Sequence, residues 1–180
     1  LKSALGVLAT GNGSRVELPL VSVTDGNNFN VNSGGQVVVP LLTTVKNGAL
    51  SISGNGQFPI GQLTNIDGSN VTAGAGAKLT FPLLTSFRMA PFVSTFSANG
   101  AGAELHFPEL VEVLVNETTS AGSINTQASN GGILTLAKFA SPLKAAPQVT
   151  ATGNGSRVEL PSVTAVDGNI FSASNGGQIR

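Results

Sequence analysis

"ATGNGSRVELP" occupies residues 9–19 and recurs, letter for letter, at residues 151–161. The similarity extends without a gap, at the same constant offset, over residues 1–38 against residues 143–180. Self-similarity at a fixed offset is typical of repeat architectures. Because this 142-residue repeat is too long for one structural unit, the sequence is expected to contain a shorter internal period.

The shorter period is a motif of the form apolar, any, apolar, corner residue, any, apolar. Its first four copies follow a constant 21-residue period and the later copies start at wider steps, at Val16, Val37, Phe58, Leu79, Leu105, Leu134 and Val158. A glycine turn such as "GNG" or "SGG" lies ahead of each copy, and an eighth turn, "NGG", begins at residue 175. Eight turns predict about eight rungs of roughly 21–30 residues each.

Alternation inside the motif predicts strands rather than helices. Stretches such as "VEL" and "LHF" place a polar residue between two apolar ones, which is the two-residue period of a strand with alternate side chains inward. A second alternating pair, such as Phe29 and Val31, precedes most turns. Proline suits the recurring corner because it supplies no N–H to a ladder, and glycine suits the tight turns. The sequence therefore predicts an all-β fold, a parallel β-solenoid (right-handed β-helix), as a single domain over residues 1–180.

Stacking the rungs predicts three columns of side chains. The apolar core column is Val16, Val37, Phe58, Leu79, Leu105, Leu134, Val158 and Ile179. A short outward hydroxyl column is Ser22, Thr43, Thr64 and Thr85. At the next corner the charge alternates in sign along Asp25, Lys46, Asp67 and Arg88. Each corner charge is expected to face opposite charges above and below, which favours the 21-residue register although each exposed pair contributes only about 0–1 kcal/mol.

Two consecutive rungs, from Gly76 to Gly102 and from Gly102 to Gly132, are longer than their neighbours. Insertions in solenoids are normally extruded as loops on one face. The segments "RMAPFV" (residues 88–93) and "VNETTSAG" (residues 115–122) are therefore expected to bulge outward near each other. Any ligand site is expected there, with Glu109, Glu112 and Glu117 as its candidate residues.

Composition excludes several classes of partner. Only 10% of the residues are charged and the net charge is zero, which leaves no electrostatic footprint for nucleic acid or an anionic membrane. The absence of cysteine excludes disulfides and thiolate zinc sites. Apolar runs are far shorter than the ~20 residues that a membrane helix needs. We therefore expect no nucleic-acid partner and no membrane span in this segment.

The residues offer little catalytic chemistry. Polysaccharide-active β-helix enzymes need clustered aspartates for calcium binding or acid–base work, whereas Asp25, Asp67 and Asp167 lie in widely separated rungs. We therefore expect no enzyme and assign no catalytic, cofactor-binding or metal-binding residue. The twice-occurring "GNGSR" lacks the Lys-Ser/Thr of a phosphate loop and is interpreted as a plain turn.

The richest polar cluster lies in "ELHFPELVEV" (residues 104–113) and comprises Glu104, His106, Glu109 and Glu112. His106 takes the outward middle place of its strand, where other rungs carry Glu17, Thr80 or Glu159. An ordinary solvated face is the favoured interpretation of the cluster. Metal or sugar contact is the alternative, ahead of catalysis.

Two rungs, "GGQVVVPLLTTVKNGALSIS" (residues 34–53) and "GAGAKLTFPLLTSFRMA" (residues 74–90), resemble the Gly/Ser/Thr-rich repeats of bacterial secreted and cell-surface right-handed β-helix proteins, many of them adhesin-like. The resemblance implies an extracellular or cell-surface location. A second resemblance, to leucine-rich-repeat or receptor-L-domain proteins, is carried by "ALSISGNG" (residues 49–56).

Three functional classes follow. The leading one is a structural or adhesive repeat module, a rigid rod segment whose partners are neighbouring repeats, copies of itself arranged head to tail, or cell-surface and matrix glycans. A carbohydrate-binding or carbohydrate-processing β-helix is the second, and an ice-binding solenoid with a regular outward Thr array is the third. Because both ends of the sequence match internal stretches, the chain is expected to be an excerpt of a longer array or filament with a 142-residue period.

Overall fold

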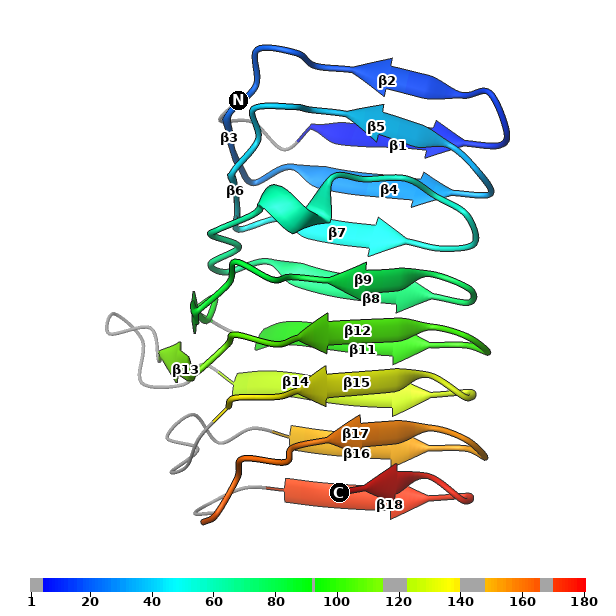
Figure 1. Cartoon of the computed structure of the whole chain (residues 1–180), viewed down its shortest axis with the longest axis vertical. Helices are drawn as coiled ribbons and strands as arrows, with labels where there is room; N and C mark the ends of the chain where they lie inside the picture. Colours follow the sequence, from blue (N-terminus) through cyan, green and yellow to red (C-terminus); the bar gives the residue numbers. More distant parts are fainter. Residues whose placement is uncertain (1–4, 92, 115–122, 140–147, 166–169) are drawn as a thin grey trace.

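A computed structural model of the chain describes residues 5–91, 93–114, 123–139, 148–165 and 170–180. The chain winds as a parallel β-solenoid, as the sequence predicts (Figure 1). It has about seven turns, against the eight rungs expected. Strands make up its regular structure within these ranges, apart from the three-residue 3-10 helix η1 (Ile60–Gln62). Every turn of the solenoid except the third carries strands on two opposing walls, and some turns carry a further strand between them.

The first wall is a parallel sheet of eight strands. In sheet order they are β1 (Gly6–Thr10), β4 (Asn28–Asn32), β7 (Ala49–Ile52), β8 (Asn70–Gly74), β11 (Val93–Asn99), β14 (Ser123–Ser129), β16 (Gln148–Thr152) and β18 (Ile170–Ser174). Strands β11 and β14 have seven residues each, against five or four in the other six. Longer strands therefore take up part of the extra length of the two long rungs.

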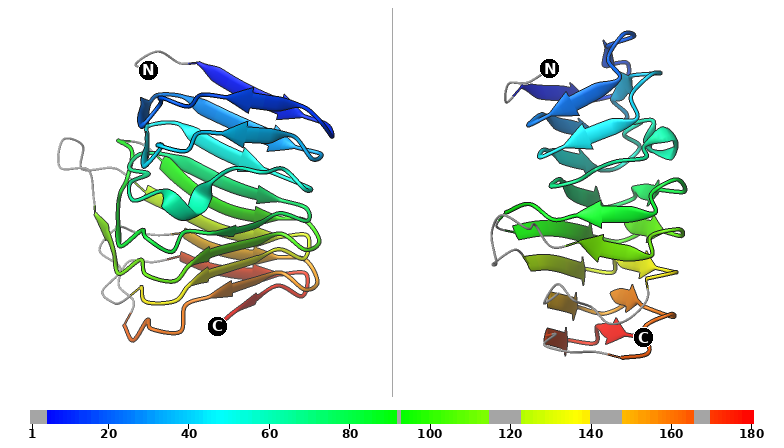
Figure 2. Two further views of the ribbon diagram at one scale, coloured as in Figure 1. Left: turned by 45° about the horizontal axis from the view of Figure 1, so that its top comes forward. Right: turned by 90° about the vertical axis from the view of Figure 1, so that its left-hand side faces the viewer.

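The second wall stacks against the first, as the two further views show (Figure 2). It consists of two separate parallel sheets. One contains β2 (Arg15–Glu17) and β5 (Gln36–Val38), and the other contains β9 (Lys78–Thr80), β12 (Glu104–Phe107), β15 (Ile133–Leu136), β17 (Arg157–Glu159) and β19 (Gln178–Ile179). The third rung lies between these sheets and carries η1 where the motif predicts a strand, so the second wall is interrupted there.

The third side carries two short parallel pairs, β3 (Val23–Asp25) with β6 (Thr44–Lys46) and β10 (Ser86–Arg88) with β13 (Glu112–Leu114). Asp25 lies opposite Lys46, which confirms the 21-residue register at the corner. Asp25 and Asp67 each accept a hydrogen bond at this corner: Asn47 Nδ2 donates to Asp25 Oδ1 at 2.8 Å, and the backbone N–H of Arg88 donates to Asp67 Oδ1 at 2.7 Å.

The expected core column is confirmed. In the five-stranded sheet, consecutive strands place the same positions opposite one another, in the order Leu79, Leu105, Leu134, Val158 and Ile179. Val37 lies opposite Val16 in the other sheet. Val16, Phe58 and Ile179 are half-buried and packed against the core, and the remaining members are buried. The hydroxyl column Ser22, Thr43, Thr64 and Thr85 is exposed, as expected.

Close approach between rungs explains the glycines at the turns. A Cβ atom on Gly35 would lie 2.2 Å from the carbonyl oxygen of Ala9 in the preceding rung. The residue before it, Gly34, has φ +84°, a left-handed conformation that side chains other than glycine rarely adopt. The turn therefore needs glycine for two separate reasons, space at one position and backbone conformation at the other.

Candidate functional site

The acidic cluster singled out in the sequence is divided among separate contacts. Glu104 Oε1 lies 2.7 Å from Lys78 Nζ of the preceding rung. Glu109 Oε2 lies 2.6 Å from Lys138 Nζ of the following rung. His106 is half-buried and lies in register between two threonines, Thr80 and Thr135. Pairing of both carboxylates with lysines supports the interpretation of this region as a solvated, ion-paired face.

Glu112 is exposed and lies opposite Ser86 in the pair formed by β10 and β13. Glu117 lies outside the described residues. Within the described ranges, no group of three or more His, Cys, Asp or Glu side chains is arranged to hold a metal ion. The cluster therefore provides no metal-site geometry in the part of the chain that the structure describes.

The inserted segment at residues 88–93 does not bulge outward throughout its described part. The segment "VNETTSAG" and Phe92 of "RMAPFV" lie outside the described residues. Met89 is 1% exposed and belongs to the core. The backbone N–H of Ala90 donates to Ser94 Oγ at 3.0 Å. The expected outward bulge is therefore wrong at Met89, because this side chain extends the apolar core instead of leaving it.

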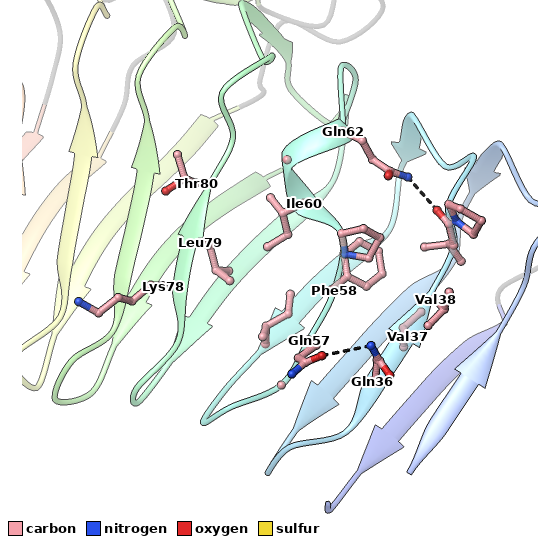
Figure 3. Close-up of a pocket in the computed structure, with 16 residues that line it drawn as sticks. Gln36, Val37, Val38, Gln57, Phe58, Ile60, Gln62, Lys78, Leu79 and Thr80 are labelled. Atoms are coloured by element: carbon pink, nitrogen blue, oxygen red, sulfur yellow. Dashed lines mark hydrogen bonds between the residues drawn. The ribbon is translucent and has the colours of Figure 1, made fainter. Parts of the chain in front are cut away.

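A groove of about 740 Å³ opens in the second wall, at the third rung. Strand β5 forms one side, β9 forms the other, and residues of the third rung lie between them (Figure 3). The sequence places a regular rung here and expects a ligand site at the long rungs instead. The groove thus lies in a rung that the motif does not single out.

Proline in the middle of the third rung's motif explains why the ladder stops. The backbone N–H of Gln57 donates to the carbonyl of Gly35 in the preceding rung at 2.9 Å, as a parallel ladder requires. Two residues later, the backbone N–H would again point toward the second rung, but this residue is Pro59, which has no backbone N–H. The carbonyl of Val37, its partner in a regular ladder, therefore loses that donor.

The chain leaves the wall at the same point. Pro59 has φ −79° and ψ 67°, outside the strand region, and η1 follows it directly. The backbone N–H of Ile60 donates to the carbonyl of Phe58 at 2.8 Å, within its own rung. The local turn thus uses the donor that a strand would offer to the next rung.

Strand β9 is left as a sheet edge. In the following rungs, Glu104 N–H donates to the Ala77 carbonyl at 2.8 Å and Ile133 N–H to the Ala103 carbonyl at 2.9 Å. The equivalent bond from Lys78 to Gly56 is missing, although both residues are described. The sequence does carry a signal for this break: "FPIG" replaces patterns such as "VVVP" and "LTFP", so that proline stands inside the strand and glycine at the corner.

Three glutamines at the rim of the groove form hydrogen bonds that link the third rung to the second. Gln36 Nε2 donates to Gln57 Oε1 at 3.1 Å, which links the second and third rungs (Figure 3). Gln62 Nε2 donates to the carbonyls of Val39 and Leu42, both at 2.7 Å, and so ties the end of η1 to the second rung. The described residues that line the groove include no Asp, Glu or His. The described lining consists of apolar side chains, backbone groups, glutamine amides, the Lys78 ammonium group and the Thr80 hydroxyl.

No protein-family model, curated protein or solved structure matches this chain. Among the described residues, no helix has the length and apolar character needed to cross a bilayer.

Proposed function

We propose that this chain is a structural repeat module, a segment of a rigid rod in an adhesive or scaffolding protein outside the cell or on its surface. The observation that carries the proposal is that the first two rungs and the last two rungs share sequence and register. The resemblance to adhesin-like β-helix repeats supports the same assignment.

The shared register appears in the first wall. Strand β1 pairs with β4 so that Val7 lies opposite Phe29 and Ala9 opposite Val31. Strand β16 pairs with β18 so that Val149 lies opposite Phe171 and Ala151 opposite Ala173. Each residue of the second pairing lies 142 positions after its counterpart in the first pairing, which is the length of the long repeat. The solenoid thus returns to an equivalent rung after that repeat.

The length of one repeat follows from the sheet order. Strand β16 is the sixth strand after β1 in the eight-stranded sheet. Six rungs at the usual spacing of parallel strands extend a rod by about 29 Å. Because the register at both ends of this interval is the same, successive repeats can continue one core and one set of ladders.

The outer side of β18 offers an apolar surface on which an in-register neighbour can pack. Phe171 is 39% exposed, whereas its counterpart Phe29 is buried between β1 and β7, where it lies opposite Leu50. A further rung equivalent to β7 would cover Phe171 in the same way. Neighbouring repeats or copies arranged head to tail are therefore the partners that the proposal names.

The test is a tandem chain in which residues 1–142 are placed once more ahead of the full 180-residue chain. In-register repeats are expected to give one straight particle about 29 Å longer than the original, by electron microscopy and small-angle scattering. The matched control repeats residues 1–132 instead, which cuts a rung and shifts the register. Two bodies of variable separation from the in-register chain would contradict the rod proposal.

An adhesive function adds a separate expectation. A rod that attaches to cell-surface or matrix glycans should retain specific sugars on a glycan array, and the in-register tandem should bind them more tightly because it presents each site twice. A rod that forms normally but retains no glycan limits the proposal to a structural function.

A further inference from the structure

We infer that the groove at the third rung is a docking site for a short extended polypeptide, which pairs with the edge of β9 as an added strand. This inference goes beyond the proposed rod function and does not depend on it. The partner's chemistry is an extended backbone in which apolar residues alternate with polar ones.

The free backbone groups of β9 point into the groove. Phe81 N–H donates to the His106 carbonyl at 3.0 Å. The backbone N–H and C=O groups of the inward-facing residues of β9 and of Phe81 therefore point toward β12. In a parallel ladder, the backbone groups of the residues in between point to the opposite side. The N–H and C=O groups of Lys78 and Thr80 therefore point toward the groove. Donors and acceptors at two-residue spacing are the pattern that an added strand satisfies.

The opposite side contributes a further acceptor. The carbonyl of Val37 has no ladder donor, because Pro59 stands where the donor would be. The groove thus offers unsatisfied backbone groups from strands of both sheets of the second wall. A polypeptide can meet them, since each of its residues other than proline brings one donor and one acceptor.

The interior of the groove suits one face of a strand. Leu79 and Val37 are buried core residues at its sides, and half-buried Phe58 lies between them (Figure 3). An inserted strand would turn alternate apolar side chains toward these residues and polar ones toward solvent. This is the pattern of the chain's own wall strands, of which "GSRVELP" occurs twice.

Side chains at the rim favour a peptide over an anion or a sugar. The charge of Lys78 is matched by Glu104 at 2.7 Å. Both amide hydrogens of Gln62 are taken by the Val39 and Leu42 carbonyls. The cavity of about 740 Å³ lies within the range of roughly 300–1,000 Å³ typical of ligand pockets. Lys78 and Gln62 are thus engaged by other parts of the chain, whereas the backbone groups of β9 that face the groove have no ladder partner.

The experiment titrates the isotope-labelled chain with the capped, fluorescent peptide GSRVELP. Fluorescence anisotropy should show saturable binding, and the amide resonances of Lys78 and Thr80 should shift in proportion. A matched peptide, N-methylated at its valine and leucine, lacks the N–H groups that face β9 and should bind about tenfold more weakly or not at all. Equal binding of the two peptides would overturn the inference.

Two variants locate the site. Thr80→Pro removes the N–H that faces the groove and is tolerated on an edge strand, so the fold should persist while peptide affinity falls about tenfold or more. Thr80→Ala keeps that N–H and should bind like the unmodified chain. Unchanged affinity in Thr80→Pro would overturn the inference, as would absence of binding by the unmodified chain up to about 1 mM peptide.

A third variant closes the groove. Pro59→Val restores a ladder donor and a strand-favouring residue, so peptide affinity should fall while stability is kept or increased. Shifts of the Lys78 and Thr80 resonances by a neutral oligosaccharide, without any response to the peptide, would identify a sugar site and contradict the strand-docking inference.

Discussion

Leu79 of β9 lies directly opposite Leu105 of β12, and both side chains are buried in the core column. An aspartate at position 79 would place an unpaired charge in this stacked apolar column. We expect Leu79→Asp to lower the free energy of unfolding by more than about 3 kcal/mol, measured by chemical denaturation. Thr80→Asp, at the exposed position next to it, is the control and should change stability by about 0.5 kcal/mol or less. Equal denaturation midpoints for the two variants would contradict the core assignment.

Thr24 and Ser69 both carry buried hydroxyl groups, but removing the hydroxyl is expected to change stability in opposite directions at the two positions. Thr24 Oγ1 is buried without a hydrogen-bond partner. Thr24→Val removes that unsatisfied group and keeps the shape, so it should raise stability by about 1 kcal/mol. Ser69 Oγ donates to the Val45 carbonyl at 3.0 Å and accepts from Gly48 N–H at 3.1 Å. Ser69→Ala should therefore lower stability by about 1–3 kcal/mol, and thermal unfolding that gave the same sign for both variants would refute this reasoning.

Gly35 and Gly61 differ in the space around them. A Cβ on Gly35 would meet the Ala9 carbonyl oxygen at 2.2 Å, and because that atom belongs to the backbone of the neighbouring rung it cannot move away cheaply. We expect Gly35→Ala to destabilise the chain by more than about 2 kcal/mol. Nothing lies within 4 Å of the corresponding position on Gly61, so Gly61→Ala should be neutral or stabilise by up to about 1 kcal/mol. Calorimetry on both variants tests the difference.

The ion pair between Lys78 and Glu104 is solvent-exposed, with 68% and 42% of the two side chains accessible. Exposed pairs of this kind contribute little, because water and salt screen them. A double-mutant cycle with Lys78→Ala and Glu104→Ala should give a coupling energy of at most about 1 kcal/mol, decreasing as salt is added. A coupling several times larger, or one insensitive to salt, would show that this pair is more than a surface contact.

Much of the solenoid follows from local patterns. In a strand, alternate residues face opposite sides, so "VEL" and "LTF" already indicate which residues enter the core, and the register from Leu79 to Ile179 agrees. The 21-residue period likewise predicts the alignment of Asp25 with Lys46. These features depend on spacing along the chain, which a sequence displays directly.

The interrupted third rung shows the limit of the motif. Phe58, Ile60 and Leu63 keep the apolar spacing, and that spacing predicts a strand where the structure has η1. Spacing records which side chains are apolar, but a ladder also needs an N–H at the right residue, and Pro59 has none. The acidic cluster shows a related limit: Glu104 and Glu109 are close in sequence, yet their partners, Lys78 and Lys138, lie on different rungs.

The sequence by itself determined the class of fold, the inward column and the 142-residue repeat, because each depends on periodicity along one chain. Tertiary structure alone decided where the ladders between rungs are complete, which hydroxyls are satisfied, and where a groove opens. These features depend on pairs of backbone groups from different rungs, such as Lys78 and Gly56, which are 22 positions apart in the chain. Whether such a pair forms a hydrogen bond depends on the conformation of all the residues between them, and here the turn at Pro59 accompanies its loss.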